Sequence, residues 1–213
     1  MPPRPNGCVG RKTATHPTTT DRSPSSSGSS SPVAASGCAN RRGRVLELAA
    51  GTARNLTHYP SDVTLTGVDL SPEMLAIGHR RAAELAREAD LRLGDAQALE
   101  FPDDTFDTVV CTLGLCTIPN PGRAVAEAWR VLRPGGQILL LEHVRSPLLP
   151  VRVLQQLLEP LSVRFAADHL TREPLDYLIT EGFEVERLER SKWGIVERIS
   201  ARKPERSTIT PGA

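Results

Sequence analysis

From Arg44 onward, short apolar runs alternate with longer stretches in which apolar residues recur at helical spacing. Continuous runs of Val, Leu and Ile are typical of strands that are buried on both faces of a parallel sheet. The longer stretches can form the helices that connect such strands. The pattern therefore predicts an α/β fold in which helices cover both faces of a parallel sheet. We expect its first five strands at residues 45–48, 63–68, 91–93, 106–111 and 137–142.

Capping and helix-breaking residues mark the ends of the predicted helices. Ser71 is a good N-cap and Pro72 suits a first turn, so we expect a helix from there to about residue 89. A second helix is expected over residues 124–132, because the segment Arg133-Pro134-Gly135-Gly136 cannot continue it. In the first helix, five apolar side chains recur at helical spacing and can face the sheet: Met74, Ile77, Ala82, Leu85 and Ala86.

Residues 148–163 are rich in Leu at helical spacing. We expect a helix that is broken by Pro150 and Pro160 and packs against the body of the domain. The alternative interpretation is an apolar wall over a lipophilic substrate.

The remaining segments complete the sheet. A helix is expected over residues 171–181, with Thr171 as its N-cap and Gly182 at its end. Residues 183–190 and 194–201 read as two strands whose connection is short enough for an antiparallel hairpin. The prediction is therefore a Rossmann-like, doubly wound, seven-stranded sheet with a C-terminal antiparallel hairpin.

The first 43 residues differ in composition from the rest. Twenty-four of them are Ser, Thr, Pro or Gly, and none is Leu, Ile or aromatic. Such a segment buries too little apolar surface to offset the entropy of ordering, so we expect a disordered tail. Its basic, Ser/Thr-rich and acid-poor composition resembles an organelle transit peptide, but it lacks the amphipathic Leu/Arg pattern of one and the apolar region of a secretory signal. With few, unevenly placed cysteines, we expect a cytoplasmic protein. We expect one domain over residues 44–203 and a second disordered tail over 204–213.

Composition excludes several classes of function. The net charge is +1 and aromatic residues make up 4%, which disfavours a nucleic-acid partner. No apolar run approaches the roughly 18 residues of a transmembrane segment, although peripheral contact with a membrane is compatible with the Leu-rich stretch. The four cysteines include no CxxC pair, so we expect neither a metal site nor a disulfide scaffold. Cys111 and Cys116 are interpreted as buried apolar residues.

Acidic residues lie at the edge of the predicted sheet where doubly wound folds bind ligands. Asp69 closes the second strand eighteen residues after Gly51, where it can accept hydrogen bonds from both hydroxyls of a ribose. Asp95 can accept from an adenine amino group, or can cap a local turn instead. Glu47, in the first strand, can balance a cationic amino group or a sulfonium. These acids together predict a ligand that contains adenosine.

The loop after the first strand limits which adenosine ligand fits. Residues 49–54 read AAGTAR, which lacks the GxGxxG fingerprint of a pyrophosphate site and disfavours an NAD-dependent oxidoreductase. No GxxxxGK[ST] segment for a triphosphate is present. A turn of small residues with an acid two positions upstream suits a cofactor that carries an amino acid and a ribose but no phosphate.

Five segments, in this order, resemble the motifs of class I S-adenosylmethionine-dependent methyltransferases: residues 45–56, 66–75, 95–102, 106–109 and 132–136. The sequence is most similar to the subgroup that contains ubiquinone/menaquinone-biosynthesis and small phospholipid N-methyltransferases. The resemblance implies S-adenosyl-L-methionine as cofactor and a small, lipophilic acceptor. It also implies a set of cofactor-binding residues: Glu47, Ala49, Gly51 and Ala53 around the methionine moiety, Asp69 on the ribose, Leu70 and Met74 beside the adenine, and Asp95 and Ala96 at its edge.

The chain departs from the family pattern in two places. Family members usually have glycine at the positions of Ala49 and Ala53, and a methyl at Ala53 costs about 1 kcal/mol if the turn requires a positive φ. The segment before Arg44 also offers no apolar side chains for the helices that cover the cofactor in relatives. The alternative function is therefore a degenerate, non-catalytic Rossmann-like binding module.

Two histidines are candidates for a catalytic base. Methyl transfer needs a base only when the nucleophile carries a proton. His143 follows the fifth predicted strand, and His169 stands beside Asp168 just before the last helix. Histidine is a common general base in proteins, and the alternative for each is a structural, hydrogen-bonded histidine.

Overall fold

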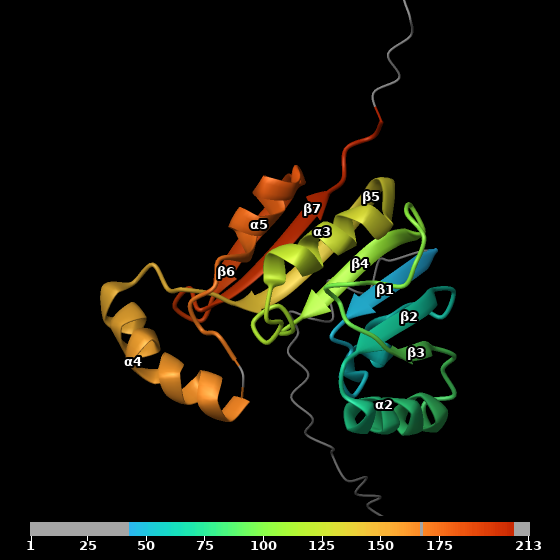
Figure 1. Ribbon diagram of the computed structural model, residues 1–213, viewed down its shortest axis with the longest axis horizontal. Coiled ribbons are helices and arrows are strands. Elements are labelled where there is room, and N and C mark those ends of the chain that lie inside the picture. The colour runs from blue at the N-terminus through green and yellow to red at the C-terminus, as the bar shows by residue number, and fades with distance from the viewer. Residues whose placement is uncertain (1–42, 167, 207–213) are drawn as a thin grey trace, which may run out of the picture.

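Seven strands form one sheet in the order β3-β2-β1-β4-β5-β7-β6 (Figure 1). The computed structural model describes residues 43–166 and 168–206. Strands β1 to β5 run parallel to one another. Strand β7 lies between β5 and β6 and is antiparallel to both. The predicted seven-stranded sheet with a C-terminal antiparallel hairpin is confirmed. The strands are β1 (Arg44–Leu48), β2 (Thr64–Asp69), β3 (Asp90–Leu93), β4 (Phe106–Thr112), β5 (Leu132–His143), β6 (Glu184–Ser191) and β7 (Val196–Arg202).

The two predicted tails fall largely outside the described residues. Only residue 43 of the first and residues 204–206 of the second lie within the described ranges. The proposed disorder of both tails therefore stays a prediction.

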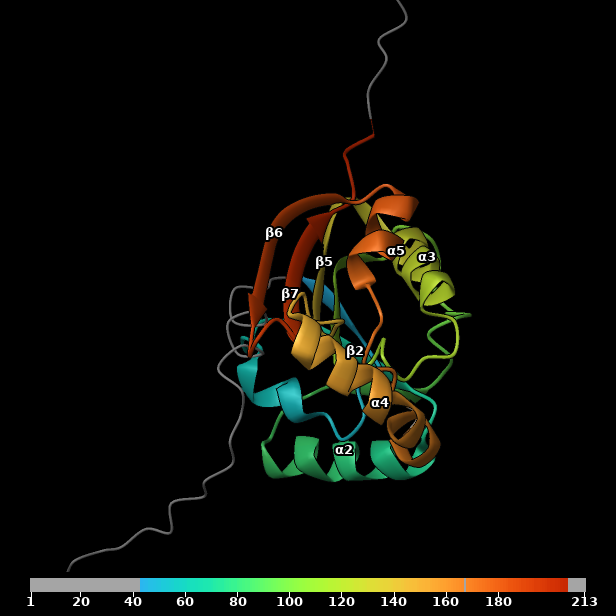
Figure 2. The same ribbon diagram turned by 90° about the vertical axis from the view of Figure 1, so that its left-hand side faces the viewer.

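Successive residues of the central strands face opposite sides of the sheet, so two apolar cores form. Leu46 and Val109 belong to one core, and their neighbours Val45 and Val110 belong to the other. Helices α3 and α5 cover the first core, and η1 and α2 cover the second (Figure 2). The helices are η1 (Arg54–His58), α2 (Pro72–Glu84), α3 (Pro121–Val131), α4 (Leu149–Ala166) and α5 (Pro174–Glu181).

Helix α2 differs from its prediction in its end and in its buried face. It ends at Glu84 rather than near residue 89, and Ala86 takes a left-handed φ of 48°. The buried residues are Leu75, Gly78 and Ala82, so only Ala82 of the predicted set is correct. The reason is close packing at Gly78, where a Cβ would stand 3.0 Å from the Leu91 side chain. Because another face of the helix than predicted is turned toward the sheet, Met74, Ile77 and Leu85 are partly exposed.

Other boundaries shift by a few residues. Helix α3 begins at Pro121 because the Asn120 side chain caps it, accepting a hydrogen bond from the Arg123 backbone at 3.1 Å. Strand β5 follows α3 directly from Leu132. Helix α5 begins at Pro174 rather than at Thr171, and ends as predicted at a left-handed glycine.

Helix α4 is continuous and does not bury its apolar residues. The proline at position 150 lies in the first turn and Pro160 lies inside the helix without ending it. The expected packing of the apolar stripe against the body is wrong, because its large side chains are 47–79% exposed. Among the helices of the described residues, none is long and apolar enough to cross a membrane. The exposed side chains are Leu149, Val153, Leu154, Leu157, Leu158, Leu161 and Phe165.

Candidate functional site

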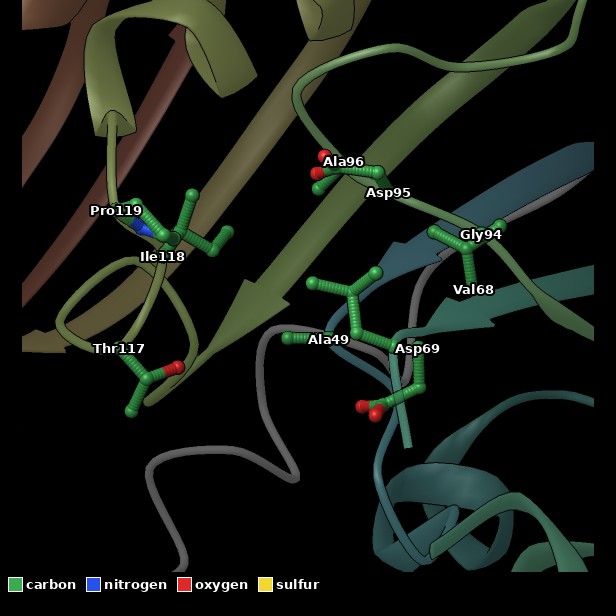
Figure 3. Close-up of a pocket in the computed structure, with 10 residues that line it drawn as sticks. Ala49, Val68, Asp69, Gly94, Asp95, Ala96, Thr117, Ile118 and Pro119 are labelled. Atoms are coloured by element: carbon green, nitrogen blue, oxygen red, sulfur yellow. The ribbon is translucent and has the colours of Figure 1, made fainter. Parts of the chain in front are cut away.

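A pocket opens beyond the carboxyl ends of β1 and β2, between the loop after β3 and the loop after β4 (Figure 3). This is where doubly wound sheets bind ligands. Five of the nine predicted cofactor residues share the pocket: Ala49, Asp69, Leu70, Asp95 and Ala96. Val68, Gly94, Thr117, Ile118 and Pro119 complete its lining.

Backbone amides hold the carboxylate of Asp69 in place at the end of β2. Asp69 Oδ2 accepts a hydrogen bond from the backbone N–H of Gly51 at 2.7 Å, and Oδ1 accepts one from Ser71 at 2.9 Å. Each carboxylate oxygen can accept a second hydrogen bond. Asp69 is thus a fixed double acceptor at the pocket, which is the arrangement that a ribose diol requires.

Asp95 caps its own turn and also lines the pocket. Its Oδ1 accepts from the backbone of Gln97 at 2.8 Å and from the Gln97 side chain at 3.0 Å. Gln97 Oε1 in turn accepts from the backbone N–H of Asn120 at 3.0 Å. The sequence analysis missed Gln97, which fixes the loop that carries Asp95 against the start of α3.

The pocket residues fit a nucleoside. Acidic groups stand at Asp69 and Asp95, and apolar side chains, among them Leu70 and Ile118, line the space with them. This combination of acceptors for hydroxyl and amino groups with apolar walls matches the donors and the flat face of an adenosine.

Four predicted cofactor residues lie outside this pocket lining. Gly51 supports Asp69 through its backbone, and Ala53 is buried behind the turn. Met74 is partly exposed on α2, and Glu47 is buried within β1.

Ala49 and Ala53, which stand where family members usually have glycine, both take a left-handed backbone conformation in the turn after β1. Ala49 has φ 50°, Gly51 has φ 55° and Ala53 has φ 54°. Alanine in this region carries a steric penalty of about 1 kcal/mol that glycine avoids. The positive φ on which the cost at Ala53 depends is thus present, and Ala49 shares it.

Replacing Ala49 with glycine is expected to raise the melting temperature by about 2–4 °C, because about 1 kcal/mol of backbone strain is relieved. Ala53→Gly is the matched comparison. Its methyl is buried in the core with Leu75, so the lost contact offsets the relief and little net change is expected. A melting temperature of Ala49→Gly at or below that of the parent protein would show that the turn is not strained there.

Glu47 is a buried carboxyl group beneath this turn. Its Oε1 accepts from Asn55 Nδ2 at 2.7 Å and its Oε2 accepts from the Tyr59 hydroxyl at 3.1 Å. Burial raises the pKa of Glu47 to about 7, although both hydrogen bonds oppose the rise. Glu47 therefore exchanges a proton near neutral pH in the absence of a cation.

This raised pKa makes stability depend on pH. Between about pH 5 and pH 7 the folded protein keeps the Glu47 proton that the unfolded chain has released, so stability falls as pH rises through this range. Glu47→Gln removes the ionisation and can keep both hydrogen bonds. We expect it to exceed the parent protein in unfolding free energy by about 1–3 kcal/mol at pH 8, with the difference largely lost at pH 5. Urea unfolding at both pH values measures this, and an equal difference at the two would contradict it.

Sequence analysis also missed Glu142, which organises the loop after β4. This residue is buried in β5, and its carboxylate accepts from the backbone N–H groups of Gly114 at 3.0 Å, Leu115 at 3.1 Å and Cys116 at 3.3 Å. Arg172 donates to the backbone carbonyls of Leu115 and Ile118 in the same loop. The sequence contained one signal for this role, because Glu142 is an acidic residue in an otherwise apolar predicted strand.

The two candidate histidines lie near acidic partners on the same side of the sheet. His143 Nδ1 is 3.6 Å from Asp168 Oδ2, and His169 Nδ1 is 3.4 Å from Glu159 Oε1 on α4. The thiol of Cys116 lies close to Asp168, and burial is the main cause of the raised pKa of this thiol. Cys116 is thus a neutral, buried thiol, as its interpretation as an apolar residue requires.

Known proteins resemble this chain in sequence and in fold. Residues 46–140 match the family described as "Methyltransferase domain". The chain is 40% identical over 120 residues to a phosphatidylethanolamine N-methyltransferase of Cereibacter sphaeroides, covering 55% of this chain and 59% of the relative. It is 40% identical over 111 residues to the ubiquinone/menaquinone biosynthesis C-methyltransferase UbiE of Methylobacterium nodulans, covering 49% and 44%. The alignments thus span about half the length of these curated relatives.

Solved structures share the fold at lower identity. An S-adenosylmethionine dependent methyltransferase from Mesorhizobium loti superposes with a TM-score of 0.63 at 22% identity, covering 80% of this chain and 96% of the other. The [4+2]-cyclase SpnF gives a TM-score of 0.67 at 20% identity, covering 82% and 79%. These likenesses support the fold alone. Residues 46–140 thus match the methyltransferase-domain family, and the motif order and the sheet order are similar to those of class I S-adenosylmethionine-dependent methyltransferases.

Proposed function

We propose that this protein transfers a methyl group from S-adenosylmethionine to a small, lipophilic acceptor of the quinone or phospholipid class. The cofactor would lie in the pocket of Figure 3, with its ribose on Asp69 and its adenine between Leu70 and the loop that carries Asp95 and Ala96. When bound, S-adenosylmethionine supplies an electrophilic methyl group with a good leaving group. The residues of the chain bind, align and exclude water.

The choice of a lipophilic acceptor rests on helix α4, whose polar side chains face the protein body while its apolar side chains face outward. Its inward contacts are polar: Gln155 Nε2 donates to the carbonyl of Val144 at 2.9 Å, and Gln155 Oε1 accepts from the backbone of Ser146 at 2.8 Å. Glu159, one turn later, meets His169. The apolar residues face outward, which is the opposite of a helix on an ordinary globular domain. The described residues leave them uncovered, and contact with an apolar partner such as a lipid surface would cover them.

The position of α4 places this apolar face near the chemistry. Figure 1 shows α4 beyond the carboxyl ends of β4 and β5, the edge of the sheet where the pocket also opens. Exposed Trp193 belongs to the β6–β7 turn, and its carbonyl accepts from the Ser146 hydroxyl at 2.7 Å just before α4. Arg152 and Arg164 on α4 add basic charge. Apolar and aromatic side chains flanked by basic ones suit the surface of an anionic bilayer.

The two relatives named above suggest the acceptors to test. Radiolabelled S-adenosylmethionine is supplied to the full chain with either a demethylated quinone or phosphatidylethanolamine, each presented in anionic vesicles. We expect label to be transferred to one of them. If S-adenosylhomocysteine binds but no lipid is labelled, the proposed acceptor class fails, and the non-catalytic binding module becomes the better description.

Two substitutions on α4 are expected to release the protein from vesicles. The variant with both Leu157→Glu and Leu161→Glu loses two apolar side chains and adds two negative charges, so vesicle binding should fall by roughly 100-fold. Ile179→Glu on α5 is the matched control, since this side chain is exposed to a similar degree away from α4. Co-sedimentation with phosphatidylglycerol-containing vesicles measures both. Equal losses in the two variants would rule out α4 as the membrane-binding element.

The base, where an acceptor needs one, is proposed to be His143 or His169. A cytoplasmic location of the protein, at the membrane surface, is proposed with the vesicle experiment as its first support.

A further inference from the structure

Three side chains with metal-binding atoms converge at the edge of the sheet. Cys116 comes from the loop after β4, His143 ends β5, and Asp168 lies between α4 and α5. One ligand atom of each residue lies within 4.8 Å of the corresponding atoms of the other two. Three separate segments thus bring a thiol, an imidazole and a carboxylate to one point.

A second observation points to a missing partner. His143 Nδ1 and Asp168 Oδ1 are both shielded from solvent, and neither has a hydrogen-bond partner in the part of the chain that the structure describes. The nearest contact between the two side chains, from His143 Nδ1 to Asp168 Oδ2, is 3.6 Å and too long for a hydrogen bond. Leaving such atoms without a partner costs free energy. A cation between them would satisfy both.

From this geometry we infer that Cys116, His143 and Asp168 bind a divalent transition-metal ion, with Zn²⁺ as the best match. Sulfur, nitrogen and oxygen donors are the ligands that Zn²⁺ takes in proteins, at about 2.0–2.3 Å. Bonds of this length place tetrahedral donors about 3.3–3.8 Å apart, so donors that stand up to 4.8 Å apart close by up to about 1.5 Å when the ion binds. The Cys116 thiol loses its proton to solvent and its sulfur bonds to the metal as a thiolate.

The coordination would leave one position open. Three protein ligands plus an exchangeable fourth position are typical of catalytic rather than structural zinc sites. The neighbouring Thr117 lines the cofactor pocket, so the open position would lie close to the site of methyl transfer. In this assignment His143 is a ligand, and His169 is the remaining candidate for a base. The inference contradicts our expectation from cysteine spacing, because these ligands are far apart in sequence.

Cobalt binding tests the site without any assay of methyl transfer. The full chain, with Cys8 and Cys38 replaced by serine to remove the thiols outside the described residues, is freed of metal with a chelator and titrated with Co²⁺. We expect one equivalent to bind, with the near-ultraviolet charge-transfer band of a cobalt thiolate and the visible bands of tetrahedral cobalt. Added Zn²⁺ should remove both sets of bands.

Matched variants identify the ligands. Cys116→Ser should lose the charge-transfer band, and His143→Gln and Asp168→Asn should each weaken binding at least tenfold. Cys111→Ser is the control, because Cys111 is equally buried but lies outside the cluster. Retention of the band in Cys116→Ser, or no saturable binding at about 100-fold excess Co²⁺, would overturn the inference. Thermal melting shows whether each variant is folded. Added Zn²⁺ should also raise the melting temperature of the parent protein and of Cys111→Ser, but not that of Cys116→Ser. Neither failure would affect the proposed methyl transfer.

Discussion

Replacing Asp69 with alanine is expected to abolish the binding of S-adenosylhomocysteine. The carboxylate is held by the backbone amides of Gly51 and Ser71, and its free acceptor positions face the pocket. Two hydrogen bonds from ribose hydroxyls to a charged acceptor contribute about 1.5–3 kcal/mol each, so their loss weakens binding by roughly 100-fold or more. Asp69→Asn keeps one acceptor oxygen and should lose less.

A thermal shift measures the loss directly. At 100 times Kd a ligand adds ~2.7 kcal/mol to stability, which for a domain of this size is a rise of roughly 5–10 °C. The parent protein should show this rise with S-adenosylhomocysteine and not with NAD, and Asp69→Ala should show none. Asp90→Ala is the control, since Asp90 is an exposed acid that pairs with Arg92 at the start of β3. An undiminished shift in Asp69→Ala would remove the ribose assignment.

The sequence predicted the fold better than the site because the two depend on different information. Strand positions follow from local apolar runs, and the order of Asp69 and Asp95 after their strands is fixed by the chain. Both acids therefore came to the pocket as expected. The buried face of α2 depended instead on contact between Gly78 and Leu91, which no spacing reveals.

Long-range polar contacts were equally hidden from the sequence. Gln97 and Arg172 act through backbone groups of other loops, so their role depends on where the fold brings those loops. The proposed metal-binding cluster shows the same limit, since Cys116, His143 and Asp168 meet only because the loop after β4, the end of β5 and the connection from α4 to α5 lie together at one edge. The exposure of the apolar face of α4 is also a tertiary property, because the same spacing would suit a packed helix.

Removing the carboxylate of Glu142 is expected to destabilise the protein more than any other single change considered. Glu142 is almost completely buried and accepts hydrogen bonds from three consecutive backbone N–H groups, at Gly114, Leu115 and Cys116. Glu142→Ala removes the acceptor of all three buried donors. The expected cost is about 3–5 kcal/mol, or a fall in melting temperature of roughly 8–15 °C.

Glu142→Gln separates the hydrogen bonds from the packing. Its amide oxygen can still accept from Gly114 and Leu115, whereas its amide nitrogen would face the N–H of Cys116, so we expect a cost of about 1–2 kcal/mol. Glu186→Ala, which removes a carboxylate paired with Arg202 on the exposed edge strand, should cost less than about 1 kcal/mol. Differential scanning calorimetry of the three variants ranks them by their loss of stability. Because the anchored loop continues into Thr117 and Ile118 at the pocket, Glu142→Gln should also weaken S-adenosylhomocysteine binding while the protein stays folded. A Glu142→Ala variant as stable as Glu186→Ala would show that this loop is held by other contacts.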